Sequence, residues 1–249
     1  MARVSGKVAL ITGAGMGLGR ATALLLAREG ATLAISDVNQ EAGAETVELI
    51  RQAGGRASFQ KHDVSDPDAW TSVLKAFEEE FGRLDVLVNN AAFQQHVPDF
   101  ADITVEQFDR TMKTNLYGYF HMAQAAVPHM KPGGAIVMTG SVTGIMGNEM
   151  LLDYSLTKGG IHAFARSLGT HLAPKGIRVN VVAPGPVWTP LNPADRDAEG
   201  TSDFGSGTVM GRPAQPEEIA PAYVFLASPQ CSSFITGEVL PIIGGYGGG

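Results

Sequence analysis

The sequence predicts an α/β fold in which helices cover both faces of a parallel β-sheet. Short apolar or β-branched runs alternate with longer helical patterns, and this alternation is typical of parallel sheets. The first of these runs leads directly into a glycine-rich turn and then a helix. No internal repeat or interdomain linker interrupts the pattern, so residues 1–249 are expected to form a single domain.

The expected strands are runs in which apolar and β-branched residues dominate, as buried strands require. In chain order they are Val8–Thr12, Thr32–Ser36, Ala57–Lys61, Val86–Asn89, Ala135–Thr139, Arg178–Val182 and Val239–Ile242. The stretches between them follow longer helical patterns. They predict helices over Gly19–Glu29, Gln40–Gln52, Asp66–Phe81, Val105–Met130, Tyr154–Ala173 and Pro216–Ala227.

A glycine-rich turn, residues 12–19, follows the first strand and reads TGAGMGLG. Glycines let a backbone approach a pyrophosphate closely, and the N-terminus of the next helix offers unpaired N–H groups. Asp37 follows the second expected strand. An acidic group at that place accepts hydrogen bonds from the adenosine ribose of a dinucleotide and repels a 2′-phosphate. Together the two features predict a dinucleotide-binding site.

Tyr154 and Lys158 stand at positions i and i+4 of an expected helix, so their side chains share one face. A free tyrosine has a pKa of about 10. A nearby lysine ammonium stabilises the phenolate and lowers that pKa. The pair is therefore a candidate general acid/base, although a Tyr and a Lys also meet by chance at this spacing in many helices.

Composition argues against several other classes of protein. The formal net charge is −7 and no cluster of Lys and Arg is present, so no basic surface for nucleic acid is expected. The single cysteine, Cys231, suits a reducing compartment. The apolar run Val8–Ile11 is too short for a secretory signal or a membrane span, so we expect a cytoplasmic protein. The histidines show no metal-ligand spacing, and no metal site is expected.

The motifs, taken in order, resemble those of the short-chain dehydrogenase/reductase family over essentially the whole chain. The glycine turn matches TGxxxGxG, and residues 89–92 (NNAA) resemble the family's NNAG segment. Asp63 and Val64 match the pair that contacts adenine. Asn115 matches the catalytic asparagine, and Ser141 precedes Tyr154 at the family's spacing. Residues 184–189 resemble the segment that contacts the nicotinamide.

The resemblance implies a doubly wound Rossmann domain with a seven-stranded parallel sheet in the order 3-2-1-4-5-6-7. It also implies hydride transfer with a nicotinamide cofactor. Tyr154 would then exchange a proton with the substrate oxygen, and Ser141 would hold that oxygen. Lys158 would lower the pKa of Tyr154 and bind the nicotinamide ribose, while Asn115 would position a water. The implied cofactor-binding residues are Gly13, Met16, Gly17, Leu18, Gly19, Asp37, Val38, Asp63, Val64, Asn90, Ala91, Ala92, Tyr154, Lys158, Pro184, Gly185, Val187 and Thr189.

Departures from the family pattern refine these expectations. Met16 and Val38 stand where NADP-preferring members often carry Arg, so with Asp37 they predict NAD as the cofactor. Ile243 replaces the aspartate of the usual C-terminal VDGG pattern, and structural roles of that aspartate do not transfer. The run from Gly147 to Glu149 resembles a branch described as glucose/ribitol-dehydrogenase-like.

Eight residues are expected to line the substrate pocket. They are Ser141, Thr143, Gln94, Met146, Glu149, Trp188, Leu191 and Phe204, a mixture that suits a medium-sized alcohol or ketone. Residues 188–213, rich in Pro, Gly, Ser and Asp, predict a substrate-binding loop that closes over the reacting end of the cofactor.

The leading interpretation is an NAD-dependent enzyme that interconverts a secondary alcohol, such as a sugar or polyol, and its ketone. Two alternatives stay open: a 3-oxoacyl thioester reductase, and a cofactor-binding protein without catalysis. Apolar residues along Tyr154–Ala173 and around Leu116 and Phe120 also predict a homotetramer, with a dimer as the fallback.

Overall fold

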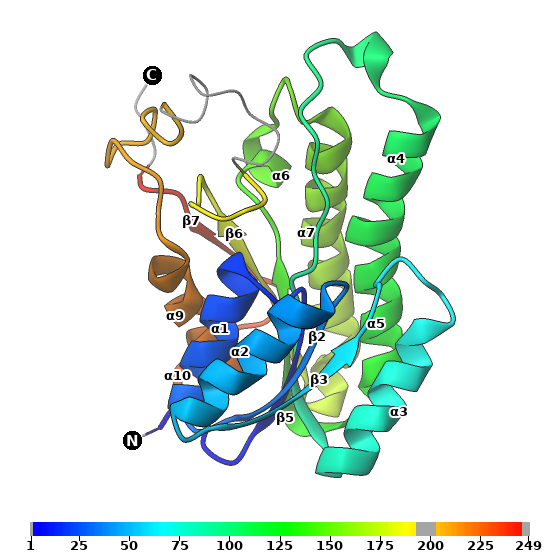
Figure 1. Ribbon diagram of the computed structural model, residues 1–249, viewed down its shortest axis with the longest axis vertical. Helices are drawn as coiled ribbons and strands as arrows, with labels where there is room; N and C mark the ends of the chain where they lie inside the picture. The colour runs from blue at the N-terminus through cyan, green and yellow to red at the C-terminus, as the bar shows by residue number, and fades with distance from the viewer. Residues whose placement is uncertain (1, 193–202, 246–249) are drawn as a thin grey trace.

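The computed structural model describes residues 2–192 and 203–245, which form one parallel sheet between two layers of helices (Figure 1). The strands are β1 (Val8–Thr12), β2 (Thr32–Asp37), β3 (Arg56–Lys61), β4 (Leu84–Asn89), β5 (Met130–Thr139), β6 (Arg178–Pro184) and β7 (Val239–Ile242). Their order in the sheet is β3-β2-β1-β4-β5-β6-β7, and each neighbouring pair is parallel. The predicted fold class and strand order are confirmed.

Helices cover the two faces of the sheet in separate groups (Figure 1). One group consists of α1 (Gly17–Arg28), α2 (Gln40–Gln52) and α9 (Pro216–Ala227), with the short α10 (Pro229–Ser232) beside α9. The other consists of α3 (Ala69–Phe81), α5 (Gly118–Ala126) and α7 (Leu152–Leu172). Helix α4 (Val105–Met112) extends the line of α5, and α6 (Thr143–Met146) is a single turn that follows β5.

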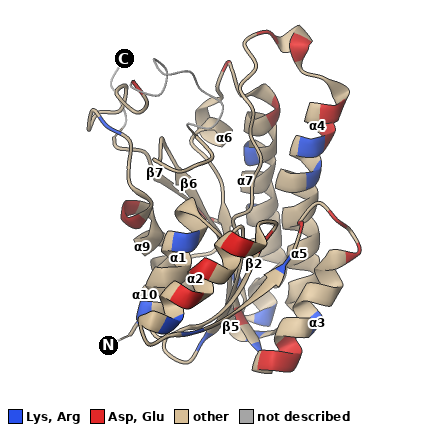
Figure 2. Cartoon of the chain, viewed as in Figure 1, with Lys and Arg blue, Asp and Glu red and all other residues tan. Residues whose placement is uncertain are grey.

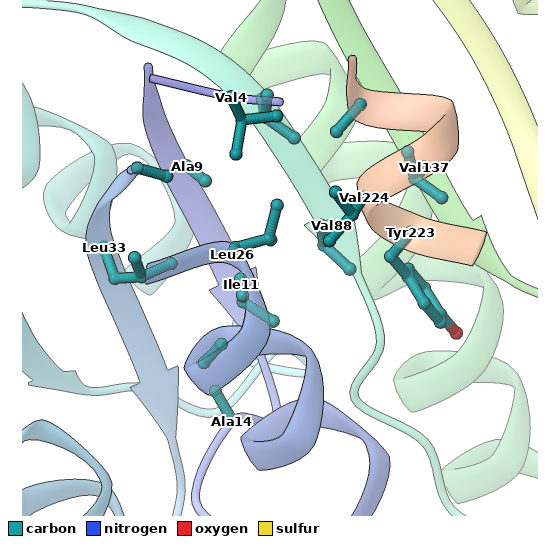
Figure 3. Close-up of a cluster of buried hydrophobic side chains, with 14 of the residues drawn as sticks. Val4, Ala9, Ile11, Ala14, Leu26, Leu33, Val88, Val137, Tyr223 and Val224 are labelled. Atoms are coloured by element: carbon teal, nitrogen blue, oxygen red, sulfur yellow. The ribbon is translucent and has the colours of Figure 1, made fainter. Parts of the chain in front are cut away.

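The period of two along each strand divides the core between these layers. In β1, Ala9 and Ile11 join the cluster under α1 and α9, while Leu10 between them joins the cluster under α3, α5 and α7. All three side chains are fully buried. Figure 3 shows Ile11 and Leu26 with Val88, Val137 and Tyr223, the side that α1 and α9 cover. Burial on both faces explains why β1 is almost wholly apolar.

The expected helix Val105–Met130 is wrong in its extent. The chain instead forms α4, a π-helical turn at Lys113–Tyr117, α5, and a 3-10 turn at Val127–His129, and Met130 already belongs to β5. Pro128 lacks the N–H that an α-helix requires at an interior position. The α-helix therefore ends at Ala126.

Smaller differences concern the ends of elements. Helix α7 begins at Leu152 rather than Tyr154, and β6 continues to Pro184. Helices α6 and α10 were not expected, because a single turn carries no recognisable apolar period.

Two features of the surface bear on function. Basic residues are scattered over several helices in Figure 2 and do not gather on one element. Within residues 2–192 and 203–245, none of the helices has the length and hydropathy needed to cross a membrane.

Gly43 provides a test of the packing of α2 on the sheet. A Cβ atom at this position would lie 2.0 Å from the Phe59 ring of β3. Overpacking costs about 1–3 kcal/mol, whereas replacing an interior helical glycine by alanine gains at most about 1 kcal/mol. We therefore expect Gly43→Ala to lower the free energy of unfolding by about 1 kcal/mol, measured by chemical denaturation.

The matched control is Gly159→Ala in α7, where the nearest atom to a new Cβ is Gly144 O at 3.6 Å. This contact is ordinary, so helix propensity decides and the control should be as stable as the parent or slightly more stable. Equal destabilisation by both variants would contradict the packing argument.

Candidate active site

A cleft of about 890 Å³ opens at the carboxyl ends of the central strands. The sheet order places β1 between β2 and β4, so the chain winds in opposite directions from this point. Ligands of open α/β sheets bind in the crevice at such a switch point. The walls include the segments at the ends of six strands: residues 13–19, 37–39, 62–65, 90–94, 139–143 and 184–192.

The glycine turn forms a cradle that side chains would fill. A Cβ atom at Gly13 would lie 2.7 Å from Ala91 Cα, and one at Gly19 would lie 2.0 Å from Gly13 O. Gly13 and Gly17 also have positive φ angles of 64° and 53°. The turn therefore brings bare backbone and the N-terminus of α1 into the cleft, which suits a pyrophosphate.

Two carboxylates, Asp37 and Asp63, line one part of this cleft. Asp37 Oδ2 accepts a hydrogen bond from Gly15 N at 2.8 Å, and Oδ1 accepts one from Asn39 N at 2.9 Å. These bonds fix the carboxylate, and each oxygen keeps a lone pair for a further donor. Met16 and Val38 line the same part and add no positive charge.

A serine, a tyrosine and a lysine meet where β5 ends. Ser141 Oγ accepts hydrogen bonds from Thr143 N at 3.1 Å and Thr143 Oγ1 at 3.0 Å, so its own O–H remains available as a donor. Lys158 Nζ donates to Thr139 O at 2.7 Å and lies 5.3 Å from the Tyr154 ring centroid.

Three strand spacings separate β2 from β5, roughly 14 Å at about 4.8 Å each. The site therefore has the length of an extended ligand.

Burial governs the protonation of the tyrosine and the lysine. Removal from water raises the pKa of Tyr154 to about 12, and its hydrogen bond with Ser141 opposes this shift. The same loss of hydration lowers the pKa of Lys158 to about 7. We expected Lys158 to lower the pKa of Tyr154, but burial of the phenol is the larger effect here. At neutral pH Tyr154 is a protonated hydrogen-bond donor.

Asn115 lies behind the cleft rather than in its lining. It is fully buried in the π-helical turn, where its Oδ1 accepts from Phe93 N and its Nδ2 donates to Phe93 O, both at 2.8 Å. Nδ2 also approaches Thr157 Oγ1 at 3.2 Å. The side chain thus ties the segment after β4 to the helix that carries Tyr154.

The structure brings nearly all of the expected residues to one cleft. All of the expected cofactor-binding residues line it, together with Ser141, Thr143, Gln94, Leu191 and Phe204 of the expected substrate pocket.

Three residues of the expected substrate pocket do not line the cleft. Met146 points to a smaller neighbouring cavity. Glu149 is exposed on the turn before α7, and the Trp188 ring packs on Phe204 with 6.0 Å between centroids. Of the expected substrate-binding loop 188–213, residues 193–202 lie outside the described part of the chain.

Several lining residues were not expected from the sequence, among them His62, Arg110 and Thr114. Arg110 and Thr114 stand at i and i+4, so both face the cleft from α4 and the turn after it. His62 could have been expected in the cleft, because it immediately precedes Asp63 in the sequence. Among residues 2–192 and 203–245, no three His, Cys, Asp or Glu side chains are placed to hold a metal ion.

The fold and the cleft define a class of dinucleotide-binding oxidoreductases. A family model described as enoyl-(acyl carrier protein) reductase matches residues 13–247. The chain belongs to the short-chain dehydrogenase/reductase family, whose members bind a nicotinamide cofactor.

Individual relatives show how far the similarity extends. The glucose and ribitol dehydrogenase of Daucus carota is 44% identical, over 98% of this chain and 86% of that protein. The chloroplastic NADPH-dependent aldehyde reductase 1 of Arabidopsis thaliana is 43% identical, over 98% of this chain and 87% of that protein. The structure of a short chain dehydrogenase from Burkholderia cenocepacia J2315 in complex with NADP superposes with a TM-score of 0.91 at 33% identity, covering 98% of each chain.

Proposed function

We propose that this protein interconverts a secondary alcohol and its ketone by hydride transfer, with NAD as the cofactor. The observation that carries the proposal is the convergence of Ser141, Tyr154 and Lys158 on the cleft that the glycine turn opens. The nicotinamide ring, when bound, supplies or accepts the hydride. Relatives named glucose and ribitol dehydrogenase support a hydroxy compound as the substrate, whether a sugar, a polyol or another secondary alcohol.

The residues of the cleft divide the remaining work. Ser141 donates to the substrate oxygen, because its own lone pairs are already occupied by Thr143. Tyr154 gives a proton to that oxygen during ketone reduction and removes one during alcohol oxidation. With its pKa raised by burial, Tyr154 is ready to act as the acid at neutral pH, whereas oxidation becomes faster as pH rises towards that pKa. Lys158, held by Thr139 O, places a donor beside the phenol for the cofactor ribose.

The preference for NAD rests on Asp37 and on the lack of a basic side chain at positions 16 and 38. A ribose phosphate at this place would meet the fixed Asp37 carboxylate. Two relatives are associated with the phosphorylated cofactor: one is named NADPH-dependent, and the structure of the other contains NADP. Cofactor choice is therefore a property to be measured on this chain.

We further propose that the protein is a cytoplasmic homotetramer. Large apolar side chains are exposed on the helices beside the site, including Phe108, Tyr117, Phe120 and Leu156. Exposed apolar surface of this kind marks an interface, and symmetric assembly would bury it. The lone Cys231 leaves no internal disulfide and suits a reducing compartment.

Tyr154→Phe tests the catalytic assignment. The change keeps the ring but removes the proton that reaches the substrate oxygen. We expect kcat to fall by about 10²-fold or more, while NAD affinity measured by fluorescence titration stays within a factor of a few. Tyr117→Phe, which removes a hydroxyl from an exposed tyrosine, is the matched control and should keep full activity. A Tyr154→Phe variant with most of its turnover would move the acid/base role to another group.

Asp37→Ala tests the cofactor assignment. The parent protein should prefer NAD to NADP by at least ~10-fold in kcat/KM, and the variant should narrow this ratio because the repelling carboxylate is gone. Asp66→Ala removes the same charge from an exposed position nearby and should leave the ratio unchanged. Equal efficiency of the parent with both cofactors would contradict the role given to Asp37.

The assembly is tested by light scattering of the purified protein at micromolar concentration. We expect a mass near four times that of one chain, and half that mass would indicate the dimer. Tyr117→Lys with Phe120→Lys should lower the mass, because charges would replace apolar contacts in the interface. A single-chain mass for the parent protein would contradict the proposal.

A further inference from the structure

A second cavity of about 360 Å³ lies beside the main cleft. One wall is α6 with the residue before it, and the floor is the chain at Gly185 and Pro186 after β6. The remaining walls are residues 203–208 and the C-terminal segment 243–245. Two residues beyond the first of these walls, Met210 N donates a hydrogen bond to Gly244 O at 3.0 Å, and this bond ties the two walls together. The cavity is thus formed by segments that the backbone holds together.

The second cavity is continuous with the reaction site. Val142, Gly185, Pro186 and Phe204 line both spaces. Val142 directly follows Ser141, and its N–H donates to Pro184 O at 2.8 Å. Val142 and Phe204 therefore lie where the two spaces meet.

The lining of the second cavity is mainly apolar. Val142, Met146, Pro186, Phe204 and Ile243 supply apolar side chains, glycines supply much of the rest, and Thr208 contributes a hydroxyl group. Among the described residues that line it, Asp203 alone carries a charge, and this side chain is exposed to solvent.

Ile243 decides the character of the inner wall. Its Cα would lie 3.0 Å from a Cβ at Gly185, so the two backbones touch at the junction of the cavities. Gly185 N also donates to Ile242 O at 2.9 Å, which fixes this contact. A carboxylate there would favour water or hydroxyl groups, whereas isoleucine favours hydrocarbon.

We propose that the second cavity binds an apolar substituent of the substrate, so that the preferred substrates are secondary alcohols or ketones with an alkyl or aryl group. This inference rests on the proposed hydride transfer and names the substrate class for it. The reacting oxygen lies with Ser141 and Tyr154, and the apolar group extends past Phe204 towards Ile243 and Met146. A polyol, with a hydroxyl on each carbon, would leave its hydroxyls unpaired in this cavity.

The experiment measures kcat/KM with NAD for straight-chain methyl carbinols of three to eight carbon atoms, and for ribitol. We expect a rise of about fourfold per added methylene until the cavity is filled. Ribitol should be a poorer substrate than the longest carbinol. Ile243→Asp should flatten this rise and lower kcat/KM for the longest carbinol at least about tenfold, with little change for the shortest.

Ile243→Val is the matched control, because it keeps an apolar side chain at the same place and should keep the rise. Met146→Gln is an independent variant on α6. Because the Met146 side chain is 70% exposed, we expect this variant to fold. Like Ile243→Asp, it should reduce the increase in kcat/KM per added methylene. If Ile243→Asp does not fold, Met146→Gln tests the proposal instead, by whether it reduces the increase in kcat/KM with chain length.

The outcomes separate the subsite from the reaction. If the carbinols or ribitol are oxidised but kcat/KM does not depend on the chain length of the carbinol, the apolar subsite is overturned and the hydride transfer stands. An unchanged rise in both Ile243→Asp and Met146→Gln would place the apolar group elsewhere and also overturn it. NAD binding without oxidation of any alcohol, and NADH binding without reduction of the matching ketones, would overturn the proposed function itself.

Discussion

A chain of hydrogen bonds beneath the cleft joins the carboxyl ends of β1, β4 and β5, and the site depends on it. Asn90 Nδ2 donates to the carbonyl oxygens of Thr12 and Gly13, and Asn90 Oδ1 accepts from Thr139 Oγ1. The Thr139 carbonyl in turn accepts from Lys158 Nζ. Paired polar groups in a buried setting hold their geometry closely, because leaving any one of them unpaired is costly. The network therefore fixes the distance between the glycine turn and the catalytic helix.

The same arrangement buries the ammonium of Lys158 and compensates only part of its lost hydration. Lys158 is completely buried, and within the described part of the chain no carboxylate forms an ion pair with it. Its contacts are Thr139 O and the rings of Tyr119 and Tyr154, at 5.2 Å and 5.3 Å. These contacts offset only part of the lost hydration, which is why the pKa of Lys158 falls to about 7. An acidic partner would raise this pKa, because it would favour the charged ammonium.

The part of the site that could be predicted from the sequence is the part fixed by element ends and by helical period. The glycine turn and Asp37 follow strands directly, and Tyr154 and Lys158 share one helix face, so their places follow from the fold class. Met146 and Trp188 lie in or beside loops, where no period sets the direction of a side chain, and neither lines the main cleft. The π-helical turn at Asn115 was also hidden, because the sequence from Val105 to Ala126 carries one continuous helical pattern.

The two halves of the cleft therefore differ in what constrains them. At the cofactor half, Gly13, Asn90 and Thr139 bond to one another, and a Cβ at Gly13 or Gly19 would strike backbone, so substitutions there disturb several strands together. At the second cavity, α6, residues 203–208 and residues 243–245 contribute side chains that are not members of the Asn90–Thr139 network. Ile243 belongs to this second set and is not among the residues that bond to Lys158 or Thr139. One fold can keep its cofactor site while other positions vary, because most residues that line the second cavity differ from those of the cofactor half.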